Sequence, residues 1–140
     1  MKKNNENILM MKDLYFSKFS YENLRDMEAS QIDVRHDIKY MSKKENENII
    51  KVIVNTNIKN KKETIKLELE TVGEFEINPA DLDSVTKKFI MTKNTLAIMF
   101  PFIRSEISIL TTQPGVMPIL LQPINLNSLT ETDIKICEES

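Results

Sequence analysis

The 140-residue sequence has one cysteine, one histidine, two glycines and no tryptophan. One cysteine excludes an intramolecular disulfide bond, and one histidine leaves no partner for a histidine cluster that would bind a metal or transfer protons. No glycine-rich phosphate loop, Gly-x-Ser-x-Gly or His-Glu-x-x-His motif is present. We therefore expect a protein that is not an enzyme and that binds no metal and no cofactor.

Long apolar runs are also absent. The sequence contains no stretch of eighteen apolar residues, the length needed to span a membrane. No apolar core follows the polar N-terminus as it would in a signal peptide. The formal net charge of -2 gives no strong field for nucleic acid or an anionic membrane. With Cys137 unpaired, these absences predict a cytoplasmic protein that binds no nucleic acid and inserts into no membrane.

Four segments alternate between apolar and polar residues, a pattern typical of antiparallel strands with one wet face. In residues 32–40, for example, Ile38 and Tyr40 face one side and Asp37 faces the other. We expect a bulge at Gly73, where a missing Cβ would relieve a local kink. The predicted strands cover residues 14–22, 32–40, 49–58 and 64–77.

Beyond Pro79 the apolar spacing becomes helical and continues to about Thr112. Pro101 lies inside this run, and we expect the helix to kink or break there because proline removes a backbone donor and clashes with the preceding turn. Residues 113–125 contain three prolines and one glycine. They predict an extended apolar connector.

Residues 126–137 are predicted to form a short final helix. Strands followed by helices define an α+β domain, here a four-stranded antiparallel sheet followed by a long C-terminal helix. We expect one domain over residues 14–137, with a flexible N-terminus at 1–13 and a tail at 138–140.

The helical run is apolar on more than one side, because Ile98, Phe102 and Ile109 lie outside its main stripe. A helix that is apolar nearly all round is buried. One chain of this length is hard pressed to bury it alone, so we predict an oligomer with this helix at the interface.

The apolar connector either covers the core or forms a surface that holds unfolded polypeptide, by burial and by strand addition. Methionine-containing surfaces adapt to varied partners, although most of the eight methionines are expected in the core. We predict a client-binding groove lined by Phe75, Ile77, Met99, Phe102, Met117, Leu120, Leu121, Ile124 and Leu126.

Other polar residues have simpler interpretations. His36 lies on the apolar face of the second predicted strand, where we expect a packed side chain. Cys137 stands beside two glutamates, which raise a thiol pKa, so it is expected to be inert. The alternating acids of the fourth strand, such as Glu68 and Glu70, form either a solvated face or a docking face for a basic partner.

Several of these segments resemble SecB, the bacterial protein-export chaperone. The resemblance includes Phe-Pro-Phe-Ile-Arg-Ser-Glu at residues 100–106, Leu-Leu-Gln-Pro-Ile-Asn-Leu at 120–126 and the strand 67–77 with its Gly-x-Phe turn. The opening segment 14–22 fits the family's first strand. In all, the resemblance covers most of residues 14–129.

This resemblance implies a homotetramer built as a dimer of dimers, which binds non-native precursor proteins without ATP. It also implies delivery to the SecA motor through acidic residues on the sheet, where Glu22 and Glu68 match two family positions. Lys18 falls where the family can carry an acid. SecB-like proteins also protect antitoxins in toxin–antitoxin systems, which gives an alternative function.

Overall fold

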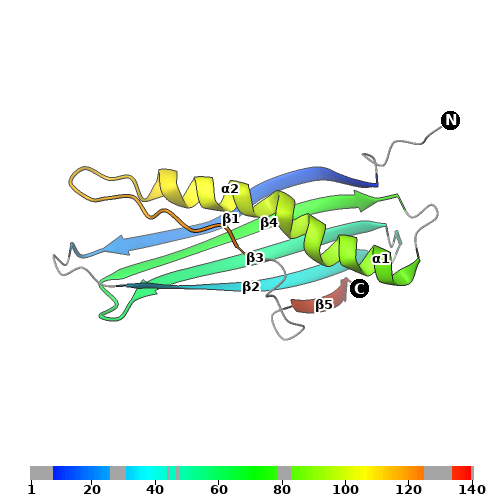
Figure 1. The fold of residues 1–140 in the computed structure, drawn as a ribbon, viewed down its shortest axis with the longest axis horizontal. Helices are drawn as coiled ribbons and strands as arrows, with labels where there is room; N and C mark the ends of the chain where they lie inside the picture. The colour runs from blue at the N-terminus through cyan, green and yellow to red at the C-terminus, as the bar shows by residue number, and fades with distance from the viewer. Residues whose placement is uncertain are drawn as a thin grey trace.

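The alternating segments form the strands of one sheet, and the helical segment lies across one face of it (Figure 1). The computed structural model describes residues 8–25, 31–43, 45–46, 48–78, 83–124 and 134–139. The elements are β1 (Leu9–Asn23), β2 (Ile32–Lys43), β3 (Ile49–Asn60), β4 (Ile65–Ile77), α1 (Ser84–Phe89), the π-helical turn η2 (Ile90–Asn94), α2 (Thr95–Leu110) and β5 (Ile134–Glu139).

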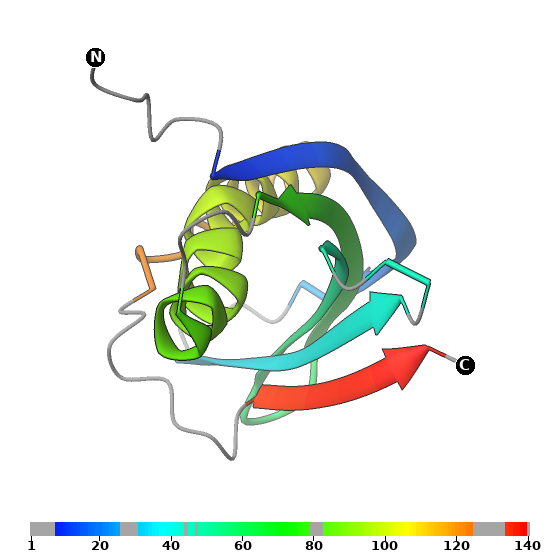
Figure 2. The same cartoon turned by 90° about the vertical axis from the view of Figure 1, so that its right-hand side faces the viewer.

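The strand order is β1-β4-β3-β2-β5, so the first and fourth strands are neighbours although they lie far apart in the chain. The pairings of β1 with β4, β4 with β3 and β3 with β2 are antiparallel. The sheet curves around the helical layer when viewed from the end (Figure 2). The predicted four-stranded antiparallel sheet followed by a long helix is therefore confirmed.

The sheet face beneath the helix forms the core. Val54, Leu69 and Phe75 from the sheet and Leu96 and Ile103 from α2 have no exposed surface. Burying an apolar side chain of this size contributes about 1.5–3 kcal/mol. The core therefore depends on the alternate strand residues that the period-two pattern identified.

Gly73 does not form the expected bulge, because it pairs in register with Leu14 of β1 and Val52 of β3. The register shifts between β1 and β4 arise where β1 has an extra residue. A Cβ at Gly73 would lie 2.9 Å from Cε1 of Phe75 and 3.0 Å from Sδ of Met99. The glycine thus makes room for the helix to pack closely on the sheet.

Of the two expected effects of Pro101, a kink or a break, the break does not occur, because α2 continues through this residue. A proline costs the helix one hydrogen bond, and the flanking Phe100 and Ile103 are buried against the sheet, which holds the helix together. The helical geometry changes earlier, in η2, where the N–H of Thr95 donates to the carbonyl of Ile90.

The C-terminal segment is the largest departure from the prediction. Residues 134–137, expected in a final helix, belong to β5, which pairs in parallel with the Ile38–Lys43 part of β2. The backbone groups along an open sheet edge favour such pairing, and the alternating Ile134 and Ile136 suit a strand. Residues 126–133 of the predicted helix lie outside the described residues.

The predicted domain limits also shift. β1 begins at Leu9, so the last five residues of the predicted flexible segment 1–13 are part of the sheet. At the other end, Glu138 and Glu139 of the predicted tail belong to β5.

Candidate functional site

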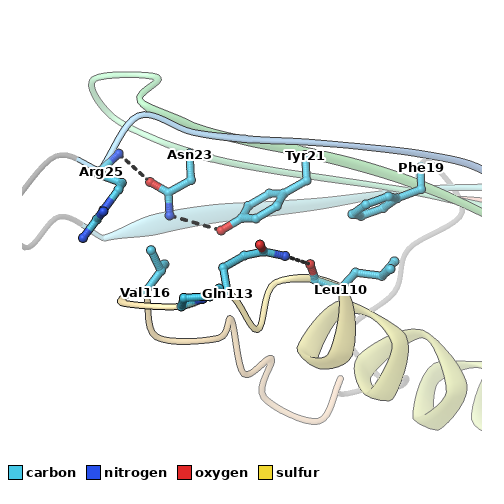
Figure 3. A pocket seen from close by; sticks show the side chains of 8 residues that line it. Phe19, Tyr21, Asn23, Arg25, Leu110, Gln113 and Val116 are labelled. Atoms are coloured by element: carbon cyan, nitrogen blue, oxygen red, sulfur yellow. Dashed lines mark hydrogen bonds between the residues drawn. The ribbon is translucent and has the colours of Figure 1, made fainter.

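An open pocket of about 470 Å³ lies between the end of β1 and the loop that follows α2 (Figure 3). We call it the Tyr21 pocket. Pockets of 300–1,000 Å³ accommodate small molecules or a few side chains of a partner. Its lining consists of Phe19, Tyr21, Asn23, Arg25, Leu110, Gln113, Pro114 and Val116.

The aromatic wall of the pocket follows from the period of the strand. Phe19, Tyr21 and Asn23 alternate along β1 and therefore share the face that looks toward the helical layer. The rings of Phe19 and Tyr21 are 6.4 Å apart and tilted by 34°. The Tyr21 hydroxyl accepts a hydrogen bond from Nδ2 of Asn23 at 3.1 Å. This wall offers apolar area with a polar edge.

Arg25 closes the β1 side of the pocket in an unusual backbone conformation. Its φ is 60°, in the left-handed region, which costs a residue with a Cβ about 1–2 kcal/mol. Its N–H donates to Oδ1 of Asn23 at 2.8 Å, which holds the turn in place. The chain of hydrogen bonds from Tyr21 through Asn23 therefore fixes the position of Arg25.

The opposite wall belongs to the connector, which turns after α2 and runs back alongside it (Figure 1). Two bonds attach the connector to the helix: the N–H of Ile119 donates to Oγ1 of Thr111 at 2.8 Å, and Nε of Arg104 donates to the carbonyl of Leu121 at 3.2 Å. The connector is therefore a fixed part of the surface.

Five of the nine predicted groove residues reach the surface to different degrees. Met117 is 85% exposed and Leu120 is 69% exposed, and Phe102 on α2 is also exposed. Leu121 and Ile124 are half-buried and pack against the core. The structure thus places large apolar side chains along the connector, where they are free to contact a partner.

The remaining predicted groove residues are not on this surface. Phe75, Ile77 and Met99 are fully buried in the core, so they support the surface from beneath. They belong to the strand face and helix stripe that pack on each other, and periodicity does not distinguish such a stripe from a groove. Leu126 lies outside the described residues.

None of the predicted groove residues lines the Tyr21 pocket, which sequence reasoning missed. The signal was present in the alternation of Phe19 and Tyr21 and in the turn-forming pair Pro114–Gly115. What the pattern lacked was the order of the strands, which brings the end of β1 next to the loop after α2.

The two predicted docking acids, Glu22 and Glu68, lie on the outer face of the sheet, away from the helix. Glu68 accepts a hydrogen bond from Nδ2 of Asn55 at 3.1 Å and pairs with Nζ of Lys18 at 3.0 Å. The bond from Asn55, followed by the contact with Lys18, lowers the pKa of Glu68. Glu22 is exposed.

His36 is packed, as predicted. Its Nδ1 lies 2.9 Å from Oγ1 of Thr56, and its ring meets the ring of Phe100 edge-on at 4.9 Å. Burial lowers the pKa of His36 to about 4, against the opposing effect of Asp37, so the side chain is neutral at pH 7. Within the described residues, no cluster of three or more His, Cys, Asp or Glu side chains is placed to hold a metal ion.

The structure is an α+β domain with an exposed apolar surface, a feature that marks interaction or ligand-binding sites. Residues 2–135 match the family model of the preprotein translocase subunit SecB, and the chain belongs to this family. The resemblance found in the sequence is thereby confirmed, and the protein is a chaperone of the SecB family. Among the described helices, none is long and apolar enough to cross a membrane.

Individual relatives are distant. The protein-export protein SecB of Orientia tsutsugamushi (strain Boryong) is 27% identical over 127 residues, 84% of this chain and 78% of that protein. Its counterpart in Rickettsia akari is 32% identical over 102 residues, 71% of this chain and 65% of that protein. An uncharacterized protein of Methanocaldococcus jannaschii is 27% identical over 111 residues, 78% of this chain and 70% of that protein.

A solved structure shares the fold. The SecB-like chaperone of Mycobacterium tuberculosis, in complex with a ChAD peptide from the HigA1 antitoxin, superposes with a TM-score of 0.67. The two chains are 11% identical, and the match covers 83% of this chain and 90% of that one. At this identity the match supports the architecture alone.

Proposed function

We propose that this protein is an ATP-independent holdase that keeps precursor proteins unfolded in the cytoplasm for Sec-dependent export, and that it catalyses no reaction. The observation that carries the proposal is the row of exposed apolar side chains on a connector held by two hydrogen bonds. Met117 and Leu120 stand out from this connector. A fixed apolar surface binds clients without first paying the entropy of ordering itself.

In this proposal, client chains bury apolar side chains against the connector and in the Tyr21 pocket. Each Å² of apolar surface removed from water contributes roughly 25 cal/mol, so modest contacts along an extended client add up to useful affinity. Phe102, Leu121, Ile124 and Leu126 are proposed to complete the surface. Phe75, Ile77 and Met99 are proposed to act only by supporting it.

The first test is suppression of aggregation of several unrelated denatured proteins at stoichiometric chaperone and without ATP. We expect broad suppression by the wild type and a clear loss in Leu120→Asp, because an added carboxylate must be desolvated on client binding. Tyr15→Asp is the matched control, since Tyr15 is also exposed but lies on the outer face of the sheet. Equal losses in both variants would remove Leu120 from the client surface.

We further propose that the active form is a homotetramer, a dimer of dimers. The face of α1 and α2 turned away from the sheet also exposes Val85, Phe89 and Ile109, and a second copy of the chain is the proposed occupant. Light scattering should give the mass of four chains for the wild type and a smaller mass for Ile109→Asp. A wild-type monomer at micromolar concentration would contradict the assembly.

Docking to SecA is proposed to use Glu22 and Glu68 on the outer face. Glu68 is engaged by Lys18, which competes with a basic partner for the same carboxylate. We therefore expect Glu22→Gln with Glu68→Gln to weaken SecA binding, and Lys18→Met to strengthen it, as measured by calorimetry. Unchanged SecA affinity in the double variant would place docking elsewhere.

A chaperone dedicated to one antitoxin is the second candidate. It is supported by the solved relative of this fold, which holds an antitoxin peptide. This candidate predicts one tight client and weak action on generic unfolded proteins. Absence of suppression for every generic client, together with a single partner recovered from the native cytoplasm, would favour it over the export role.

A further inference from the structure

One charged side chain stands at the rim of the otherwise uncharged Tyr21 pocket. Of the eight lining residues, Arg25 alone carries a charge, beside the two aromatic rings and four apolar or amide side chains of the opposite wall. Within the described residues, the guanidinium of Arg25 forms no ion pair. A guanidinium with free donors beside an apolar cavity is an open position for a carboxylate.

The backbone of Arg25 is held from the β1 side. The strained turn at Arg25, whose N–H donates to Asn23, leaves the side chain extended toward the loop after α2 (Figure 3). Strained conformations persist where the surroundings enforce them, and they are frequent in binding sites. The backbone conformation thus sets the direction in which the Arg25 side chain leaves the turn, toward the rim of the pocket.

The loop after α2 leaves space for the guanidinium of Arg25 at Gly115. Gly115 has a φ of 73°, and a Cβ on it would lie 3.1 Å from Nη2 of Arg25. An added Cβ would therefore shift the guanidinium by a few tenths of an ångström, and at this positive φ the larger residue would itself be strained. Arg25 and Gly115, from segments ninety residues apart in the chain, fit each other.

We propose that the Tyr21 pocket selects client segments in which a large apolar residue is next to an acidic residue. The apolar side chain would occupy the space between the aromatic wall and Val116, and the carboxylate would bind Arg25. This inference rests on the proposed client-binding function and adds a sequence preference to it. An internal Asp or Glu side chain is the proposed source of the carboxylate.

The test uses fluorescein-labelled peptides with blocked ends and a central Phe. The peptides differ only in the residue after this Phe, which is Glu, Gln or Lys. Fluorescence anisotropy should show the Glu peptide binding roughly three- to tenfold tighter than the Gln peptide, the range expected for a charge-assisted bond at a partly open site. High salt should reduce this ratio.

The ratio of the affinities for the Glu and Gln peptides should fall to about one in Arg25→Gln. It should also fall in Gly115→Ala, which keeps the charge of Arg25 but shifts it. Arg35→Gln is the matched control, since it removes the same charge from the outer face, where Arg35 is exposed. An unchanged ratio in Arg25→Gln, or an equal fall in Arg35→Gln, would overturn the proposal.

Two further outcomes distinguish a failure of the acidic preference from a failure of the proposed holdase function. Equal binding of the Glu and Gln peptides to the wild type would overturn the acidic preference and leave the holdase intact. Failure of the wild type to bind any peptide or unfolded protein would overturn both. Preference only for a free C-terminal carboxylate, tested with an unblocked Gln peptide, would contradict the internal acid.

Discussion

The two faces of the sheet use the same strands for different purposes. On β4, Leu69 and Phe75 point to the helix and have no exposed surface, whereas Glu68, next to Leu69, points to the outer face and contacts Lys18. Because the alternation is strict, a substitution on one face leaves the other in place. The stability of the fold and the charges of the outer face, where docking is proposed, can therefore be changed separately in this chain.

The largest expected effect lies on the inner face. Phe75→Ala should lower the free energy of unfolding by about 3–5 kcal/mol, because it removes a buried ring and leaves a cavity. Met117→Ala, at an exposed position, should change it by about 0.5 kcal/mol or less. Urea unfolding at one fixed protein concentration measures both. A stable Phe75→Ala protein with impaired client capture would instead return Phe75 to the client surface.

A smaller effect comes from the titratable group on the inner face. The pKa of His36 is about 4 in the folded chain and 6.5 as a free side chain, so between these values the unfolded chain binds the extra proton. The contribution of neutral His36 to the free energy of unfolding should therefore be complete above pH 6.5. It should be lost as the pH falls through about 4, a decrease of about 3 kcal/mol in all.

Carboxylates also titrate near pH 4, so the measurement compares the wild type with His36→Gln. The variant should have a shallower dependence of unfolding free energy on pH between 4 and 6.5. Parallel curves for the two proteins would mean that His36 takes up its proton in the folded state as readily as in the unfolded one.

The smallest effect belongs to the outer face. Lys18 and Glu68 are 3.0 Å apart but solvent-accessible, and such pairs contribute about 0.2–1 kcal/mol. A double-mutant cycle with Lys18→Met and Glu68→Gln should give a coupling energy in that range, decreasing with added salt. A coupling well above it would show that the outer face also stabilises the fold.

The sequence predicted the four strands and the helix well because each has a clear period. Ile38 and Tyr40 alternate with charges, and Leu96, Met99 and Ile103 repeat at helical spacing. Pro101 left the prediction open between a kink and a break, and the helix stays continuous because burial of the nearby Phe100 and Ile103 compensates for one lost bond. Residues 134–137 misled it because pairing with β2 is a long-range contact that no local pattern contains.

The candidate site was less predictable for a related reason. Phe19 of β1 and Phe75 of β4 both lie on the inner face of the sheet. Phe19 lines the Tyr21 pocket, whereas Phe75 is fully buried. The difference arises because β1 is at the edge of the sheet, and β4 lies beneath α2. The direction of Arg25 depends on a positive φ, which residue type alone does not indicate.

The position of β5 has a consequence for self-assembly. A sheet with two open edges can add copies at both ends and grow into a fibre. Here β5 covers Ile38–Lys43 of β2, and the rest of that edge carries the charged residues Asp33, Arg35 and Asp37, which disfavour strand addition. Of the two edge strands in the described sheet, β1 has 15 residues and β5 has 6. Edge-to-edge pairing of two copies through β1 would therefore leave only the short β5 and the charged stretch of β2 at each outer edge, and both disfavour further strand addition.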